Sequence, residues 1–208
     1  KSLVVFIRMV FLFLSNQYHK FNLYLKPNYN PKVCVLCHFV LLLFMLVSST
    51  VSGQFIIKPD TTLDEVSLHP YATLARLGGE SISLDGVLQL DANQFETLPN
   101  SNTDLGFTSD HYWLRFSIRN ELTTTKIFFL EACRPIVDVA ELYTIDANGA
   151  VTKQVSGDAL PFSERDFKNR KTIFKVAIAP QTTKQYYLHL KSDGEAINAG
   201  LVLRSYEN

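Results

Sequence analysis

The sequence predicts an all-β fold, a jelly-roll-like antiparallel β-sandwich with one or two short helices. The first observation is the alternation of apolar and polar side chains over residues 112–119, which is typical of a strand with one buried face. The second is that short segments of this kind recur every eight to twelve residues, separated by turn formers and without a long helical period. This pattern favours a sandwich over a fold of alternating strands and helices.

The strands follow one another in the second half of the chain. After the segment 112–119 comes a fully apolar run at 127–130, and then a strand at 137–145. The sequence Asp146-Ala147-Asn148-Gly149 ends that strand, because Asn-Gly supplies the positive φ values of a tight hairpin turn. The remaining predicted strands are 151–155, 172–178, 185–190 and 199–204.

The segment before residue 112 carries weaker signals. Residues 55–57 are expected to form an edge strand, followed by a polar connection at 61–68. Ser83 can cap free amides ahead of apolar positions at helical spacing, so we expect one short helix over 83–88. The turn formers of 99–108 predict a surface loop.

Residues 1–53 form a separate basic leader, with five Lys or Arg and no Asp or Glu. Its apolar run 39–51, at about 1.5 Å per residue, is too short to cross a hydrocarbon core of about 30 Å. Lysines before the run and small residues after it predict a secretory signal peptide, cleaved between Gly53 and Gln54. An uncleaved N-terminal anchor is the alternative. Residues 1–30 begin with Lys1 rather than Met, and we set them aside as a segment that need not be native.

The exported body, residues 54–208, is then divided into an N-terminal connection at 54–73 and the sandwich at 74–208. It carries fifteen basic and twenty acidic residues, a net charge of −5, which argues against nucleic acid as a partner. Its three histidines lack metal-ligand spacing, and no nucleophile or phosphate-binding motif occurs. We therefore expect no catalytic residues, no metal and no cofactor. Paired carboxylates such as Glu164 with Asp166 are interpreted as solvated loop charges.

The segment 157–170 is the strongest candidate for a binding site, because long loops in compact domains are commonly functional or disordered. We expect Pro161, Phe162 and Phe167 to pin it to the sandwich while Arg165 and Arg170 project. Arginine suits planar contact with carboxylates or sugar hydroxyls, and Asp158 can accept from hydroxyls. A structural ion pair between Asp158 and one of these arginines is the competing interpretation.

Two further groups complete the candidate site. Arg134 and Asp138 flank the start of a strand and could reach the same end of the sandwich as the long loop, although Asp138 could equally cap backbone amides. Trp113 and Tyr143 could offer a stacking face for a sugar ring. For aromatic residues on alternating strands, burial in the core is the more common outcome.

These residues also carry a resemblance that covers about residues 74–204. The strand Tyr112-Trp113-Leu114-Arg115-Phe116, followed downstream by Gly157-Asp158, Pro161-Phe162-Ser163 and Arg165, resembles the second type of extracellular domain in bacterial seven-transmembrane receptors with diverse intracellular signalling modules (7TMR-DISM). The resemblance implies a jelly roll similar to carbohydrate-binding modules, outside the inner membrane. It further implies a seven-helix membrane domain and a cytoplasmic signalling domain as partners.

Two functions follow as hypotheses. The first is a non-catalytic periplasmic sensor that binds a small polar ligand, for which a carbohydrate is the leading class. The second is a module that contacts a protein or a second receptor copy, as in a homodimer, through an exposed strand edge.

Overall fold

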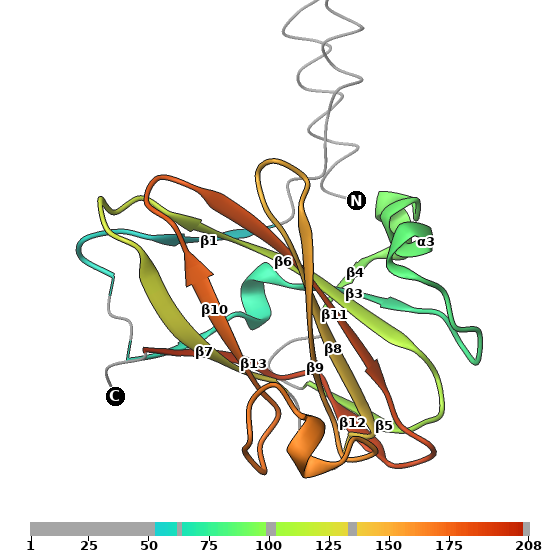
Figure 1. The fold of residues 1–208 in the computed structure, drawn as a ribbon. Helices are drawn as coiled ribbons and strands as arrows, with labels where there is room; N and C mark the ends of the chain where they lie inside the picture. Colours follow the sequence, from blue (N-terminus) through green and yellow to red (C-terminus); the bar gives the residue numbers. More distant parts are fainter. Residues whose placement is uncertain (1–52, 62–63, 99–102, 133–136, 206–208) are drawn as a thin grey trace, which may run out of the picture. The chain divides into compact units, whose positions relative to one another are not determined.

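The computed structural model describes residues 53–61, 64–98, 103–132 and 137–205. The predicted leader and Arg134 lie outside these ranges. Within them the chain forms an antiparallel β-sandwich with one short α-helix, so the predicted fold class is confirmed (Figure 1). No helix in the described ranges is long and apolar enough to span a membrane.

The larger sheet has seven strands, in the order β4-β3-β6-β11-β8-β9, with β1 parallel to β6. Both β3 and β1 pair with β6: β3 with residues 112–115 and β1 with residues 117–120. The strands of this sheet are β1 (Gln54–Ile57), β3 (Thr73–Arg76), β4 (Glu96–Thr97), β6 (Tyr112–Asn120), β8 (Val139–Ile145), β9 (Val151–Ser156) and β11 (Thr183–Lys191).

The smaller sheet has the order β10-β7-β13-β2, and a two-stranded ribbon joins β12 to β5. These strands are β2 (Glu65–Ser67), β5 (Asp104–Phe107), β7 (Lys126–Ala132), β10 (Ile173–Ile178), β12 (Ala196–Asn198) and β13 (Leu201–Ser205). The helix is α3 (Leu84–Leu88), and three short 3₁₀ turns are η1 (His69–Tyr71), η2 (Ala92–Gln94) and η3 (Phe162–Glu164).

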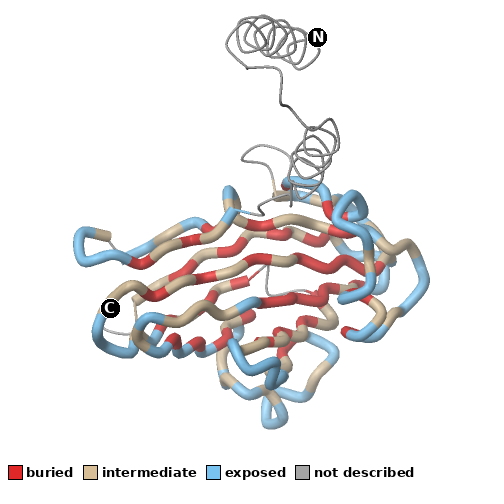
Figure 2. Tube along the Cα trace, turned by 90° about the horizontal axis from the view of Figure 1, so that it is seen from above, coloured by how far each residue is buried: buried red, intermediate tan, exposed pale blue. Residues whose placement is uncertain are grey.

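The period of two residues decides which side chains enter the core. On β6 the even-numbered residues Tyr112, Leu114, Phe116 and Ile118 are buried between the two sheets. The odd-numbered residues point to the outer face, and Figure 2 shows the resulting alternation of buried and half-buried positions along the strands. All seven predicted strands are present.

The first half of the chain differs more from the prediction. The predicted loop 99–108 contains β5, and the polar connection 61–68 contains β2. Strands β1 and β2 pair with β6 and β13, so residues of the expected N-terminal connection belong to the two sheets. These strands have three or four residues, and their apolar pattern is too short to stand out from the surrounding turns.

The helix prediction is confirmed, with Ser83 Oγ accepting a hydrogen bond from the Gly86 amide at 3.4 Å. The turn after β8 differs from the expected one, because only Gly149 has a positive φ, of 80°. Asp146 Oδ1 accepts hydrogen bonds from the amides of Asn148 and Ala150, both at 2.9 Å. The aspartate therefore organises this turn, and Asn148 does not need a left-handed backbone.

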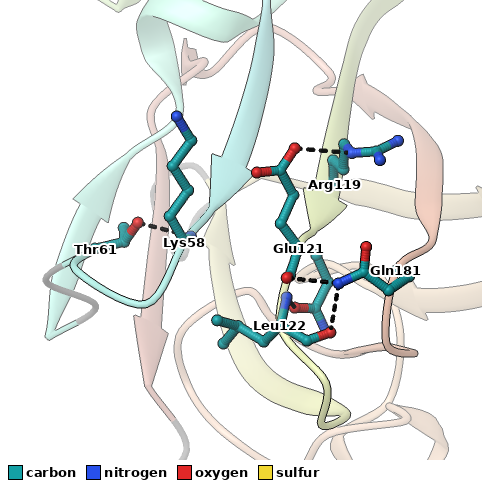
Figure 3. Close-up of polar contacts among 7 residues, drawn as sticks. Lys58, Thr61, Arg119, Glu121, Leu122 and Gln181 are labelled. Carbon is teal, nitrogen blue, oxygen red and sulfur yellow. Dashed lines mark hydrogen bonds and ion pairs between the residues drawn. The ribbon is translucent and has the colours of Figure 1, made fainter.

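One end of the sandwich is closed by a buried asparagine. The Asn120 side chain is fully buried and donates to the carbonyls of Thr124, Ile178 and Ala179 at 2.9, 2.9 and 3.2 Å, while its Oδ1 accepts from the Leu122 amide. Figure 3 shows Gln181 reaching the carbonyls of Glu121 and Leu122 beside it. We call this region, Asn120 with the turns 121–125 and 179–182, the clasp end.

Candidate functional site

The segment 157–170 lies between β9 and β10, at the opposite end of β8 and β11 from the clasp (Figure 1). It leaves β9 through Gly157, whose φ is 119°. A Cβ at this position would lie 2.2 Å from the Asp138 carbonyl oxygen, so only glycine lets the two backbones approach. The amides of Asp158 and Ala159 donate to the carbonyls of Val137 and Asp138. The first residues of the loop are thereby fixed to the start of β8.

Arg165 organises the loop from within. Its side chain is only 9% exposed. Nε donates to the Leu160 carbonyl at 3.2 Å, Nη1 to the Asn169 carbonyl at 3.4 Å, and Nη2 to Asp158 Oδ1 at 3.2 Å. The prediction that Arg165 projects is wrong, because each of its three nitrogens donates to a group of the loop itself. The ion pair with Asp158, which was the competing interpretation, is present.

The two phenylalanines of the loop have different surroundings. Phe167 packs against Phe129 of the smaller sheet, with ring centroids 5.2 Å apart. Phe162 instead leaves 51% of its surface exposed, contrary to the expectation that it pins the loop. Asp166 supplies a further attachment, since its Oδ2 accepts from the Val155 amide at 2.6 Å. The loop is thus held in place while one aromatic ring faces solvent.

Asp138 joins a third segment to this end. Its Oδ2 accepts hydrogen bonds from Ser192 Oγ at 3.1 Å and from the Asp193 amide at 2.6 Å. This carboxylate therefore caps backbone and hydroxyl donors after β11, one of the two roles considered for it. We call residues 157–170, together with Asp138 and the turn at 192–193, the loop end.

Four of the sequence candidates lie at the loop end, namely Asp138, Asp158, Arg165 and Arg170. Asp158 remains 65% exposed on its side chain despite its ion pair, and Arg170 is exposed farther along the loop. Arg134 lies outside the described residues. The two aromatic candidates, Trp113 and Tyr143, lie on the outer face of the larger sheet.

That outer face carries a small apolar cluster of its own, separate from the main core. Trp113 is 1% exposed and stacks on Tyr143 and His189 at centroid distances of 5.5 and 4.7 Å. Residues 77–95, which include α3, pack Leu84, Val87 and Phe95 on this cluster. We call residues 77–95 the cover segment. Trp113 is therefore covered, and burial was the outcome that its position on an alternating strand made more common.

The same face contains polar residues that were not singled out from the sequence. His189 Nδ1 lies 3.1 Å from Glu141 Oε2, and Lys153 Nζ lies 2.7 Å from Glu141 Oε1. These hydrogen bonds, with one from Tyr143, lower the pKa of Glu141 to about 2 despite its partial burial. The only signal in the sequence was the spacing of these residues on alternating strands, which does not reveal which strands are neighbours. No group of three or more His, Cys, Asp or Glu in the described ranges could hold a metal ion.

The fold and its loop end define an all-β domain that presents a rigid loop at one end of a sandwich. A family model for the 7TMR-DISM extracellular 2 domain matches residues 71–205, which is more than half of the chain. The chain therefore belongs to this family, the second extracellular domain of 7TMR-DISM receptors, and the resemblance found in the sequence is confirmed. The family consists of sensor domains of membrane receptors and not of catalytic domains.

No curated protein sequence matches the chain. Similar solved structures include a Cry1Da tryptic core variant from Bacillus thuringiensis, with 8% identity, a TM-score of 0.34, and coverage of 74% of this chain and 25% of that chain. Another is a GH26-CBM35 β-(1,4)-mannanase from Podospora anserina, with 15% identity, a TM-score of 0.27, and coverage of 64% and 28%. A family 6 carbohydrate-binding module has 8% identity, a TM-score of 0.27, and coverage of 51% and 85%. The chain spans 21–25% of the length of the first three structures that it matches.

Proposed function

We propose that this domain is the periplasmic sensor of a seven-transmembrane receptor and that it binds a small polar ligand of the carbohydrate class at the loop end. The observation that carries the proposal is that Arg165 holds the loop in one conformation while Phe162 and Asp158 stay exposed beside it. A binding surface that is ordered before the ligand arrives loses less conformational entropy on binding.

The chemistry of the exposed groups suits a sugar. An aromatic ring can pack on the apolar face of a pyranose, and a carboxylate can accept hydrogen bonds from its hydroxyl groups. At the loop end these two groups are Phe162 and Asp158, and exposed Arg170 adds five possible donors. The other aromatic candidates support this site less well, because Trp113 is covered and stacked on its neighbours.

In the intact receptor, a signal requires that the ligand bind one arrangement of the membrane helices better than another. The sensor would be exported by the leader, with the seven-helix domain and a cytoplasmic signalling domain as its partners, and we expect no catalysis by the domain itself. The clasp end lies on the side of β13 where Ser205 pairs with Phe128 and the described chain ends.

Isothermal titration of the chain against a panel of neutral and acidic oligosaccharides tests the proposal. We expect Phe162→Ala and Asp158→Asn to weaken binding by about tenfold each, since a stacking or charge-assisted contact contributes about 1–2 kcal/mol. Val151→Ala is the matched control, because Val151 is 50% exposed on the β8–β9 hairpin and Phe162 is 51% exposed. This control should bind as the unchanged chain does.

Two results would overturn the assignment of the site. One is a sugar that binds with the same affinity to Phe162→Ala, Asp158→Asn and the unchanged chain. The other is the absence of binding across the panel together with concentration-dependent dimers in sedimentation, which would favour the interaction module instead.

A further inference from the structure

A chain of hydrogen bonds on the outer face of the larger sheet takes no part in the proposed ligand site. His111 Nδ1 lies 2.8 Å from His189 Nε2, and the second nitrogen of His189 meets Glu141. The two imidazoles are stacked with an angle of 6° between their planes, and both are buried, with 7% and 6% of their surfaces exposed. Lys153 completes the chain on β9.

The Glu141 carboxylate determines which nitrogen atoms carry the protons in this series of hydrogen bonds. Ionised Glu141 can only accept hydrogen bonds. His189 Nδ1 must therefore carry a hydrogen and donate a hydrogen bond to Glu141. When His189 carries only this proton, its Nε2 is an acceptor, and the hydrogen bond between the rings then requires His111 Nδ1 to donate. One more proton can bind at His111 Nε2 without breaking either bond. A second additional proton, on His189 Nε2, would leave two donors facing each other.

The pair adjoins the segment that covers the outer face. His111 precedes β6, its carbonyl accepts from the Leu77 amide at 2.9 Å, and its amide donates to the Gly78 carbonyl at 2.8 Å. Residues 77 and 78 begin the cover segment. His189 stacks on Trp113, the aromatic centre of the cluster beneath that segment. A change in the protonation or position of the two histidines therefore affects the cover segment through two backbone hydrogen bonds of His111 and through the stacking of His189 on Trp113.

We propose that His111 and His189 form a proton-responsive latch that holds the cover segment closed at neutral pH and loosens it on mild acidification. The latch does not depend on the ligand proposal. Charging His111 places a cation in a buried position beside a second imidazole, and the cost of that charge weakens the packing that keeps it buried.

The surrounding charges act on this equilibrium in both directions. Burial, His189 and the ammonium of Lys191 lower the pKa of His111, whereas Asp110 raises it. Asp110, Glu141 and Lys191 act on the pair directly through charge or a hydrogen bond. Arg76 pairs with Asp110, and Tyr143 and Lys153 bind Glu141. On the cover segment, Glu80, Asp85 and Asp91 are exposed. Because the pKa of folded His111 lies below its ordinary value of 6.5, the stability from the neutral form is present above pH 6.5 and is lost as the pH falls below it.

Amide hydrogen exchange of the whole chain at pH 7.5 and pH 5.5, corrected for intrinsic exchange, tests the latch. We expect protection of the α3 amides to fall on the order of tenfold at the lower pH, because the open state binds the additional proton more readily than the closed state. In His111→Asn the side-chain amide retains a donor near the position of Nδ1 but cannot be charged, so protection should no longer depend on pH. His69→Asn, which removes a histidine of η1 outside the cluster, should behave as the unchanged chain does.

Persistent pH dependence in His111→Asn, or none in the unchanged chain, would overturn the proposal. Nitrogen NMR of the unchanged chain provides a second test that needs no variant. It should show both neutral rings protonated at Nδ1, and one proton taken up by the pair on acidification. A neutral ring that carries its proton at Nε2 instead, in either histidine, contradicts the shared hydrogen bond.

Discussion

At both ends of the sandwich, one buried or nearly buried side chain donates hydrogen bonds to backbone carbonyls, but the two side chains connect different parts of the molecule. At the clasp end, Asn120 projects from a central strand and donates to carbonyls of the turn 121–125, of the last residue of β10 and of the turn 179–182. At the loop end, Arg165 also satisfies backbone carbonyls from a nearly buried position, but its partners all belong to the loop itself. The clasp therefore connects separate segments of the sandwich, whereas Arg165 connects residues within a single loop.

Because of this difference, we expect the clasp end to contribute mainly to the stability of the fold and the loop end mainly to the proposed function. Removing the clasp side chain takes a donor away from the buried Ile178 carbonyl and from the partly buried bonds to Thr124 and Ala179, and that cost falls on the whole fold. Removing the arginine releases one loop, whose attachments through Gly157, Asp166 and Phe167 remain. The loop end can thus be altered for a ligand at little cost to the sandwich.

The clasp should give the largest effect of substitution. We expect Asn120→Ala to lower the free energy of unfolding by about 3 kcal/mol, because the fully buried Asn120 side chain makes one buried and three partly buried hydrogen bonds that are all lost. Urea denaturation measures this change. Thr124→Ala is the matched control, since Thr124 contributes only its backbone carbonyl and is exposed, and it should stay within about 0.5 kcal/mol of the unchanged chain. Equal effects would show that the clasp is not the stabilising element.

The entrance to the loop should come next. Gly157→Ala is expected to cost about 2 kcal/mol, because the added Cβ meets the Asp138 carbonyl in addition to the strain of a positive φ. Gly194→Ala shares the positive φ, at 98°, but has open space around it, and should cost about 1 kcal/mol. The comparison of their thermal midpoints isolates the contribution of the close approach. Equal thermal midpoints would mean that the loop moves away from the Asp138 carbonyl without a loss of stability.

Removal of the Arg165 side chain should lower the free energy of unfolding less than Gly157→Ala does, but it should make the loop 157–170 much less ordered. We expect Arg165→Ala to lower the free energy of unfolding by about 1 kcal/mol, since its bonds are made at the edge of the domain. Limited proteolysis should then cut within 157–170 much faster, while cleavage elsewhere is unchanged. Arg165→Lys tests the geometry, because a lysine cannot reach three acceptors in one plane. Resistance of both variants to cleavage would refute the view that this side chain orders the loop.

An effect of similar size to that of Arg165→Ala, but limited to low pH, concerns Glu141. The pKa of Glu141 is lowered from its ordinary 4.5 to about 2, so its stabilising contribution is complete above pH 4.5 and is lost as the pH falls towards 2. Partial exposure screens this contribution, which we place at about 1 kcal/mol. Glu141→Gln should flatten the fall of unfolding free energy between pH 4.5 and pH 2 while leaving the loop end unchanged. A curve as steep as that of the unchanged chain would assign the acid sensitivity to other carboxylates.

Much of the fold could be predicted because the relevant signals are local. The alternation of residues 112–119 identified β6 and its two faces, and the Ser83 cap marked the start of α3. The candidate site was predicted less completely. Asp138, Asp158 and Arg165 are indeed brought together, but the arginine points inward and Phe162 outward. An arginine in a polar loop can face either way, since its choice depends on carbonyls whose positions the loop's path determines.

The sequence alone determined which residues alternate along each strand, where turns interrupt them and to which receptor family the domain belongs. Only the tertiary structure decided that His111, His189 and Glu141 form one chain, although 78 and 48 positions separate their bonded partners. It also decided that β1 lies parallel to β6 and that Trp113 is covered by the segment 77–95. The physical reason is that backbone periodicity is a property of neighbouring residues. Strand order and burial depend instead on the packing of segments that are distant in the chain.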